Sequence, residues 1–447
     1  MRRILLSVMF VAAASTIIAG VAAQSSAAGS AMVVRAARLW DGKSDTVQSP
    51  GVVIVQDGKI RAVGAEADRL LAMTRITNIV DLGDATLLPG FMDAHTHLTM
   101  EMSLDWKQDR LDSLSQPIAE RALDASVYAR RTLMAGFTTV RDVGAGDQVD
   151  VGLRNAIRNG KIPGPRMMVA VHSIGATGGH CDEGGYRQGL LPETTESEGV
   201  ANGPDAIRRA VRLQHKYGAD VIKTCATGGV LSLTDAVDTP QLTQEELNAL
   251  VNEAHALRMK TAAHAHGAEG AKRAIRAGID SIEHGSFMDD EALDLMKQRG
   301  TCYDATLMAL VGIQERLANP AYFMPQAVKD KANAASAALE GTFRKALARG
   351  VRICFGTDAG VYAHGRNAEE FGQMVKLGMK PVEALKAGTS RNAELLGVAD
   401  KLGTLEAGKI ADVVAVPGDP TTDIRVTEKV FFVMKEGLVS KKEEARK

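Results

Sequence analysis

Two histidines separated by one residue end an apolar stretch early in the chain. The stretch begins at Leu88 and reaches His95 and His97. Side chains two positions apart on a β-strand project from the same face, so both imidazoles can reach one ion. Neutral imidazole is the commonest protein ligand for zinc-like metals. The motif is also compatible with two unrelated polar residues at a strand end, and the downstream residues decide between these interpretations.

Four further residues of ligand type follow, each at the end of a short apolar run. They are Lys223, His264, His284 and Asp358, and glycines follow each of them within a few residues. A single buried histidine is commonly a satisfied core residue. Together with the first two histidines, however, these residues make six ionisable groups at strand ends. Burying them side by side without a metal or a partner would be strongly unfavourable, so the set favours a metal site.

The elements that would position these residues alternate between short apolar runs and stretches of helix length. Candidate strands are 88–97, 138–143, 166–174, 220–226, 260–266, 281–285, 301–307 and 352–358. Eight parallel strands with intervening helices form a (β/α)8 barrel, whose site lies at the C-terminal ends of the strands. We therefore expect an α/β fold with a TIM-like (β/α)8 barrel. The helical segment 308–349 is expected to wall the site or to form an oligomer contact.

Strand signals also occur at both ends of the chain. Residues 32–85 contain short strands with an Asp57-Gly58 hairpin turn, and further strand signals fall between 410 and 434. Neither part is large enough for a core of its own, so we expect one small discontinuous β-sandwich domain. The predicted boundaries are 24–87 and 401–447 for this domain and 88–400 for the barrel.

The N-terminus is typical of a secretory signal peptide. Two arginines precede an apolar run from Ile4 to Val21, and small residues favour cleavage after Ala23. We expect residues 1–23 to be removed and the protein to be periplasmic or secreted, without a stable membrane anchor. A retained anchor is the alternative, because the run is near the lower length for crossing a bilayer.

The cysteines and the charge balance set further limits. Four widely spaced cysteines follow no compact disulfide framework, so we expect small buried hydrophobic residues without bridges; they are Cys181, Cys225, Cys302 and Cys354. The 53 basic and 54 acidic residues give a net charge of −1. This balance argues against nucleic acid or an anionic membrane surface as the main partner.

Five motifs resemble those of the amidohydrolase superfamily of metal-dependent hydrolases, in that family's order. They are Pro-Gly-Phe-Met-Asp-Ala-His-Thr-His at 89–97, Asp-Val-Ile-Lys at 220–223, Ala-His-Ala-His-Gly at 263–267, Ile-Glu-His-Gly at 282–285 and Gly-Thr-Asp-Ala-Gly at 356–360. The surroundings of Lys223 and His264 are most similar to the Xaa-Pro and Xaa-Arg/Lys dipeptidase branch. That branch also contains enzymes that hydrolyse ochratoxin.

The resemblance implies two divalent ions, with zinc expected. The first would be held by His95, His97 and Asp358. The second would be held by His264 and His284, with Lys223 bridging the two as a carbamate. An ammonium group facing two dications would be repelled, whereas a carboxylated lysine presents two anionic oxygens. The alternative for Lys223 is an ordinary lysine in a mononuclear site.

The implied reaction is attack on an amide by a hydroxide that the two ions share. Asp358 would act as base and pass the proton to the leaving amine, which an amide needs. His266 lies two residues nearer the barrel mouth than the preceding histidine, so we predict a catalytic or substrate contact for it. The alternative for His266 is to orient a metal ligand. His172 and His180, around a glycine-rich loop, are the other predicted substrate contacts. Arg141 is expected to form a structural ion pair with Asp142 or a neighbouring strand.

Three classes of function can be compared with the residues present. The leading hypothesis is hydrolysis of a peptide-like amide with release of an amino acid, by a dipeptidase, a carboxypeptidase-like enzyme or an N-acyl amino-acid amidase, including ochratoxin-type amides. A deaminase or imidazolonepropionase-like cyclic amidohydrolase commonly uses one metal and lacks the bridging lysine, so Lys223 argues against it. A non-catalytic binding or scaffold protein would be expected to lose ligands, and all six are present. Relatives in the branch form large homo-oligomers, often octamers, which implies a homo-oligomer here.

Overall fold

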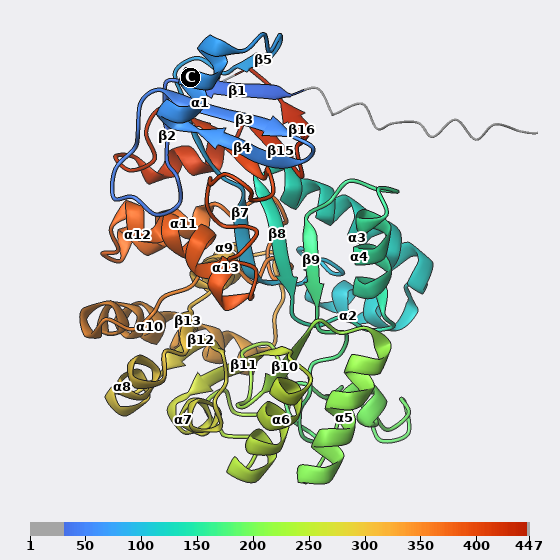
Figure 1. The fold of residues 1–447 in the computed structure, drawn as a ribbon. Helices are drawn as coiled ribbons and strands as arrows, with labels where there is room; N and C mark the ends of the chain where they lie inside the picture. Colours follow the sequence, from blue (N-terminus) through green and yellow to red (C-terminus); the bar gives the residue numbers. More distant parts are fainter. Residues whose placement is uncertain (1–30, 445–447) are drawn as a thin grey trace, which may run out of the picture.

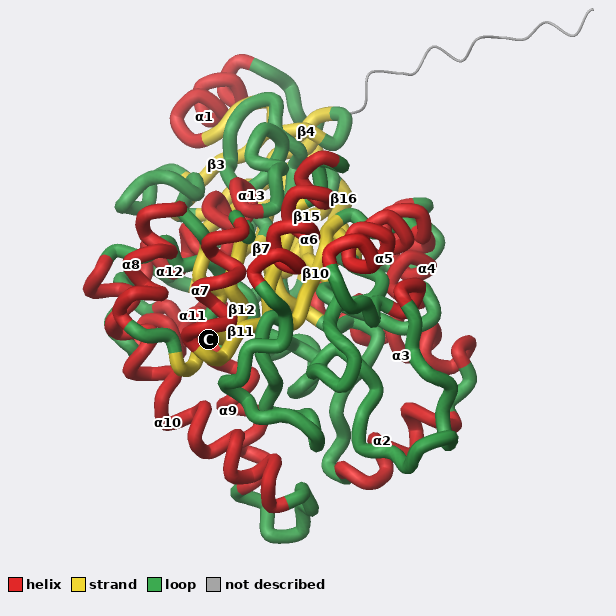
Figure 2. Tube along the Cα trace, turned by 90° about the horizontal axis from the view of Figure 1, so that it is seen from below, coloured by secondary structure: helices red, strands yellow, loops and turns green. Residues whose placement is uncertain are grey.

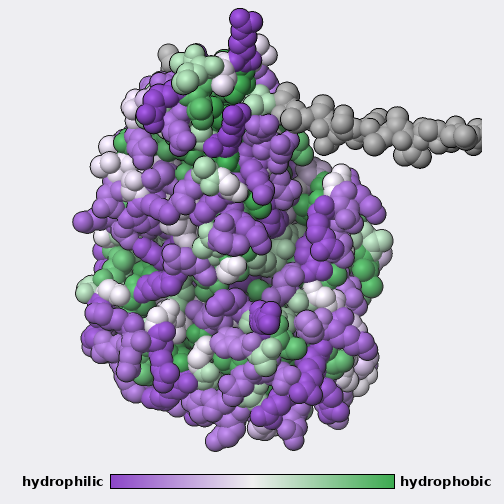
Figure 3. All heavy atoms as spheres, in the orientation of Figure 1, coloured by the Kyte–Doolittle hydropathy of each residue, from purple (hydrophilic) through white to green (hydrophobic). Residues whose placement is uncertain are grey.

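The computed structural model describes residues 31–444, so the predicted signal peptide lies outside the described residues. The chain forms a small β unit and a larger α/β unit, drawn at the top and bottom of Figure 1. Within the described residues, no helix has the length and apolar character needed to cross a bilayer. The face in Figure 3 is mostly hydrophilic, with small apolar areas between the polar side chains.

Two sheets build the small β unit. The first has the order β4-β3-β1-β5 and comes from the N-terminal part of the chain: β1 Met32–Ala36, β3 Gly51–Gln56, β4 Lys59–Val63 and β5 Asn78–Asp81. The second has the order β16-β15-β14-β6-β2 and joins both ends of the chain: β2 Arg38–Leu39, β6 Ala85–Pro89, β14 Val413–Pro417, β15 Phe432–Lys435 and β16 Leu438–Lys442. Buried side chains of both sheets share one apolar cluster, which includes Val53, Leu87 and Phe432.

The β3–β4 hairpin turns at the predicted dipeptide. Asp57 and Gly58 have φ of 52° and 73°. Positive φ at both central residues is the requirement of the two-residue turn that matches the twist of a hairpin, and Asp-Gly meets it well. Helix α1 (Gly64–Met73) follows β4 directly.

The larger unit contains parallel strands in two sheets. One sheet contains β7 Phe91–Thr96, β8 Phe137–Asp142 and β9 Arg166–Val169. The other contains β10 Val221–Cys225, β11 Lys260–Gly267, β12 Ser281–Phe287 and β13 Cys302–Asp304. Parallel bridges join Ile174 to Thr224, Tyr303 to Ile353 and Thr96 to Ala359. The first bridge links the segment after β9 directly to β10, and the other two link β13 to β7 through the segment 353–359.

Four predicted strands differ from the observed ones. The predicted strand 88–97 is divided at Gly90, so that residues 88–89 end β6 of the small β unit and β7 of the larger unit begins at Phe91. Strand β9 ends at Val169 rather than at 174, because Val171 has φ of 63°. Strand β13 ends at Asp304 rather than at 307, because Thr306 has φ of 47°. The segment 352–358 makes isolated bridges instead of a regular strand. A left-handed residue cannot continue a strand, which explains the two early ends.

Helices lie on the outside of the parallel strands, as the view from below in Figure 2 shows. They are α2 Trp106–Ser115, α3 Ile118–Met134, α4 Val149–Arg158, α5 Pro204–Tyr217, α6 Gln244–Ala256, α7 Ala268–Ala277, α8 Asp290–Arg299, α9 Leu307–Leu317, α10 Gln326–Arg349, α11 Glu369–Lys376, α12 Pro381–Lys386 and α13 Asn392–Leu395. Short helical turns occupy Glu196–Glu198, Ala387–Arg391 and Ile424–Lys429. Strand and helix side chains form one large core that includes Ile222, Leu250 and Ile282.

The cysteines are paired, so the expectation of unbridged cysteines was wrong. Cys181 is bonded to Cys225 and Cys302 to Cys354, and each pair has a Cα–Cα distance of 5.8 Å, in the usual range for a disulfide. The partners are 44 and 52 residues apart in sequence. Each bridge joins positions that the fold brings together from different strands or loops, and a pairing of this kind leaves no signature in the cysteine spacing.

Candidate metal centre

The first group of predicted ligands lies at the end of β7. His95 belongs to this strand, His97 directly follows its last residue, Thr96, and Asp358 reaches it from the segment after Ile353. Oδ1 of Asp358 lies 3.4 Å from Nε2 of His95 and 3.3 Å from Nε2 of His97. A φ of 57° at Asp358 turns the chain there, so its carboxylate meets both rings.

His95 and His97 each form a hydrogen bond through Nδ1, the ring nitrogen that points away from Asp358. These bonds determine that the other nitrogen, Nε2, carries the lone pair. Nδ1 of His95 lies 2.7 Å from Oε2 of Glu283, and Nδ1 of His97 lies 3.1 Å from the carbonyl oxygen of Gly144. The carboxylate and the carbonyl accept hydrogen bonds, so each Nδ1 donates and each neutral ring keeps its lone pair on Nε2. Two nitrogen lone pairs and a carboxylate oxygen thus converge without a hydrogen between them. This donor set fits a divalent cation.

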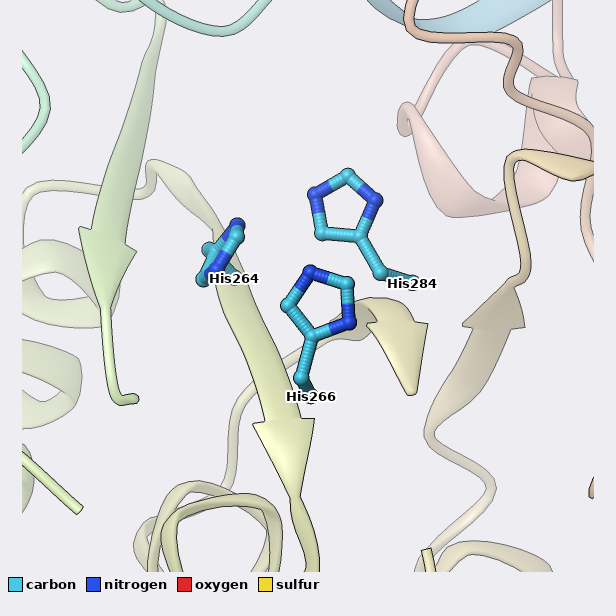
Figure 4. Close-up of side chains that lie close together, drawn as sticks. All are labelled: His264, His266 and His284. Atoms are coloured by element: carbon cyan, nitrogen blue, oxygen red, sulfur yellow. The ribbon is translucent and has the colours of Figure 1, made fainter. Parts of the chain in front are cut away.

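Three more histidines form a second group on the neighbouring strands, drawn in Figure 4. His264 and His266 project from β11, and His284 projects from β12. Ring centroids lie 4.6 Å apart for His264 and His284 and 5.0 Å apart for His266 and His284. Nε2 of His264 lies 3.1 Å from the carbonyl oxygen of Gly228, and Nδ1 of His284 lies 2.7 Å from Oγ1 of Thr306.

Burial keeps this second group of imidazoles uncharged. It lowers the pKa of His266 to about 3, and the nearby His180 adds to the effect. Burial also holds the pKa of His264 and of His284 well below the ordinary value of histidine. A neutral imidazole is the form that binds a metal ion, so the group is in its ligating state at neutral pH.

Lys223 lies between the two groups, at the end of β10. Its Nζ is 3.5 Å from Nε2 of His95, and the ring centroids of His95 and His284 are 5.0 Å apart. Burial lowers the pKa of Lys223 to about 8, and the Arg141 guanidinium acts in the same direction. A substantial fraction of the amine is therefore neutral near pH 8, and the neutral amine is the form that reacts with carbon dioxide.

Arg141 forms a different ion pair from the predicted one. Its Nη2 donates to Oε1 of Glu283 at 2.9 Å, and both side chains are fully buried. Glu283 belongs to β12, which is neither Asp142 nor a strand paired with β8. The expectation of a structural ion pair was correct in kind, but the partner was wrong because the guanidinium reaches across the interior.

The predicted substrate contacts lie at different depths. The ring of His180 packs on His264, with 4.2 Å between centroids, and therefore borders the second group. His172 is half-buried, and its backbone N–H donates to Oε1 of Gln214 at 3.2 Å. Among the described residues, neither histidine belongs to the groups of converging ligand atoms.

Sequence reasoning missed several residues that hold the ligands. Glu283 bonds His95, Thr306 bonds His284, and Nδ1 of His266 lies 2.9 Å from Oγ of Ser286. Glu283 stands beside His284 in a recognised motif, which was the one available signal. His364 was also missed; it is buried, stacks on Tyr128 and lies outside both groups of ligand atoms.

The comparison with known protein families agrees with this arrangement. The model of the Amidohydrolase family matches residues 86–441. The chain belongs to the amidohydrolase family. Members of this family have a TIM-barrel fold and typically bind divalent metals. The match covers both groups of ligand-type side chains.

Individual relatives point to the cleavage of amide bonds. Ochratoxinase of Aspergillus niger is 33% identical over 436 residues, and the match covers 92% of this chain and 86% of the relative. A crystal structure of a Xaa-Pro dipeptidase with methionine bound in its active site is 42% identical, with a TM-score of 0.86 over 92% of this chain and 100% of that chain. The crystal structure of A. niger ochratoxinase has a TM-score of 0.79 at 30% identity, over 93% of this chain and 96% of that one. The amidohydrolase is thus a hydrolase acting on carbon–nitrogen bonds.

Proposed function

We propose that this amidohydrolase uses two divalent ions to cleave a peptide-like amide and release an amino acid. The observation that carries the proposal is the position of Lys223, which is buried with its Nζ 3.5 Å from Nε2 of His95, whose ring lies 5.0 Å from that of His284 in the second group. His95, His97 and Asp358 would hold one ion, and His264 and His284 the other, with zinc as the expected metal. Lys223 would bridge them as a carbamate. When bound, the ions would supply a nucleophile at neutral pH and polarise the scissile carbonyl.

Asp358 would carry the proton. Burial favours its neutral form, but positive charge on the adjacent His95 and His97, when these rings are protonated, outweighs burial and lowers the pKa of Asp358. A cation held between the same residues would act in the same direction. The group is therefore a carboxylate at neutral pH and can accept a proton from the attacking water. It would then return that proton to the nitrogen of the departing amine, without which an amine is a very poor leaving group.

His266 would contact the substrate. It lies two residues beyond His264 on β11, and its ring lies parallel to that of His284, with 14° between the planes. Its Nδ1 faces Oγ of Ser286, so the hydroxyl fixes the ring, and Nε2 is available to a substrate oxygen. His180 and His172 would complete the substrate side. The names of the two relatives support a dipeptide or an N-acyl amino acid, including ochratoxin-type amides, as the substrate.

Further features bear on architecture and location. The three parallel bridges support closure of an eight-stranded barrel, with the segment 352–358 in the eighth place. The two disulfides support export to an oxidising compartment after removal of residues 1–23. No nucleic acid partner is proposed.

A second copy of the chain is proposed as the protein partner. Large apolar side chains are exposed on α2 and α3: Leu111, Leu114, Ile118, Leu123 and Val127. Large apolar side chains exposed in this number on two consecutive helices favour an interaction site, so we place a homo-oligomer contact on these helices rather than on 308–349 alone.

A hydrolysis screen tests the proposed function. Metal-loaded enzyme is incubated with libraries of dipeptides and N-acyl amino acids, and released amino acids are quantified. We expect amino-acid release by the wild type and a loss of about 100-fold or more in Asp358→Asn. Deamination or ring opening of a heterocycle, with no amide cleaved, would overturn the proposal.

A further inference from the structure

Hydrogen bonds link His180, Gln241, Asp235 and Ser232 in a closed cycle. Its backbone N–H donates to Oε1 of Gln241 at 2.9 Å, and Nε2 of Gln241 donates to Oδ2 of Asp235 at 2.9 Å. Oγ of Ser232 donates to Oδ1 of Asp235 at 2.7 Å. The last contact of this cycle joins Nδ1 of His180 to Oγ of Ser232, at 3.0 Å. The imidazole is thus held through both its backbone and its side chain by the loop after β10.

The direction of the last bond follows from the single hydroxyl hydrogen of Ser232. That hydrogen has two acceptors within reach, Oδ1 of Asp235 at 2.7 Å and the carbonyl oxygen of Gly229 at 3.1 Å. Neither can donate in return, so Oγ has only lone pairs left for the imidazole. Nδ1 of His180 must therefore carry the hydrogen and donate it. In the neutral ring, the lone pair then lies on Nε2.

The ring of His180 is oriented by close backbone contact. A Cβ atom at Gly229 would lie 2.2 Å from both Nδ1 and Cε1 of this ring, so the loop approaches it only because residue 229 is glycine. Nδ1 faces the loop, and the ring packs on His264 of the second group of ligands. The disulfide from Cys181 to Cys225 ties the adjacent residue to the end of β10. Nε2 of His180 therefore faces the candidate metal site and not the loop.

Lys331 of α10 fixes this loop from outside. Its Nζ donates to the carbonyl oxygens of Gly229 at 2.8 Å, Ser232 at 2.6 Å and Asp235 at 3.1 Å. An ammonium group has three hydrogens, and these three carbonyls are its nearest acceptors. Oδ1 of Asp235 lies further away, at 3.4 Å. The Lys331 side chain is only 15% exposed. A single cation therefore holds the turn that presents the serine hydroxyl to the imidazole.

We propose that Ser232 and Lys331 are positioning residues that hold His180 as the Nδ1–H tautomer, so that its Nε2 accepts a hydrogen bond from an N–H group of the substrate. The inference rests on the proposed function. An N–H donor on an amide substrate has two sources, the scissile amide itself or the free ammonium of a dipeptide. Either source makes the site selective for substrates that carry the donor.

The tautomer is tested first, without turnover. The enzyme is labelled with ¹⁵N-histidine, and the His180 signal is assigned by subtracting the spectrum of His180→Gln. We expect the Nδ1–H pattern in the wild type and in Ser232→Thr, which keeps the hydroxyl. Ser232→Ala should show mixed tautomers. An Nε2–H signal in the wild-type enzyme overturns the proposal.

The substrate contact is tested with two matched pairs of substrates. One pair compares an N-acyl amino acid with its N-methylated amide, and the other compares a dipeptide with its des-amino analogue, in which hydrogen replaces the α-ammonium group. In the wild type, we expect KM to rise about tenfold for the pair member that lacks the contacted donor, as for one lost hydrogen bond. The ratio should approach one in Ser232→Ala, with kcat changed less than KM, and should return in Ser232→Thr. Equal ratios in wild type and Ser232→Ala overturn the contact.

Two lysines of α10 test whether Lys331 holds the loop in place. Lys331→Met should raise KM as Ser232→Ala does, because the loop loses its anchor. Lys345→Met removes a lysine that is 60% exposed, and should behave as the wild type. Equal KM values for the two variants overturn the role of Lys331. If the wild type cleaves no amide at all, the proposed function fails and the substrate contact fails with it, while the nitrogen spectrum still tests the tautomer.

Discussion

Nδ1 of His95 lies 2.7 Å from Oε2 of Glu283, and both side chains are inaccessible to solvent. Although burial favours the neutral acid, Arg141 and His95 hold the pKa of Glu283 well below its usual range. An ionised carboxylate that accepts from Nδ1 directs Nε2 of His95 to the metal site and raises its basicity.

Replacing Glu283 with Gln removes that charge and keeps the size of the side chain. We expect metal affinity to fall about 10-fold to 100-fold, as for other lost partners of metal-ligating histidines. Competition with a chelator, followed by metal analysis, measures the change. Arg141→Met in the Glu283→Gln background controls for the guanidinium that is left unpaired. Wild-type affinity in Glu283→Gln would show that the carboxylate does not tune the ligand.

Lys223→Met tests the proposed bridge. A methionine fills the same space without an amine, so no carbamate can form, and we expect bound metal to fall from two ions per chain towards one. Amide hydrolysis should fall by about 100-fold or more, since both ions are needed for polarisation and for the nucleophile. Metal analysis measures the number of bound ions, and steady-state kinetics measure the rate of amide hydrolysis. Two firmly bound ions in this variant would contradict the bridge.

The pKa of Lys223, at about 8, also predicts a pH dependence for reconstitution. The neutral amine increases as pH rises through this value, so metal-free enzyme supplied with zinc and bicarbonate should regain activity faster at pH 8.5 than at pH 6.5. A rate that does not depend on bicarbonate would contradict carboxylation.

The convergence of these ligand-type side chains could be predicted because it depends on local sequence. His95 and His97 point to one side at the end of β7 through a spacing of two, and Lys223, His264 and His284 lie on parallel strands. Asp358 follows a short apolar run that forms no regular strand. The residues that orient the ligands could not be predicted in the same way. Glu283 is 188 positions from His95, and only the fold brings the two side chains together, from strands that belong to different sheets.

Strand ends were predicted less well for a related reason. Val171 and Thr306 are β-branched, and their composition favours extended backbone, yet both have positive φ. Tertiary contacts override that preference, since Thr306 bonds His284 and Val171 lies in the core. A conformation held in place by distant partners leaves no local signal in the sequence.

The bridge between Cys302 and Cys354 should contribute to stability. It closes a segment of 52 residues and so restricts the unfolded chain. Replacing both cysteines with serine should lower the free energy of unfolding by about 2–4 kcal/mol. Urea titration of protein isolated from an oxidising compartment measures this, with alkylation and mass spectrometry to confirm pairing in the wild type. Equal stability of wild type and variant would contradict the bridge.

Glu370 should make stability depend on pH. Burial raises the pKa of Glu370 to about 8, although the backbone N–H groups of Met308 and Leu307 donate to its carboxyl group and act in the opposite direction. In the unfolded chain the value is near the ordinary 4.5. Between these values the folded protein holds a proton that the unfolded chain has released. The free energy of unfolding contributed by this group therefore falls as pH rises from about 4.5 to about 8, by about 1.4 kcal/mol per pH unit.

Glu370→Gln removes the titration, so the difference in unfolding free energy between wild type and variant should change across this range in favour of the variant as pH rises. The amide also replaces one acceptor oxygen with a donor facing a backbone N–H, which lowers stability by an amount that does not vary with pH. Only the slope therefore reports the ionisation, and urea titrations at pH 5, 6, 7 and 8 measure it. Glu340→Gln serves as the matched control, because Glu340 is an exposed glutamate on another helix, α10. Parallel curves for wild type and Glu370→Gln would mean that the buried carboxyl group is ionised throughout, with the start of α9 supplying enough hydrogen bonding to outweigh burial.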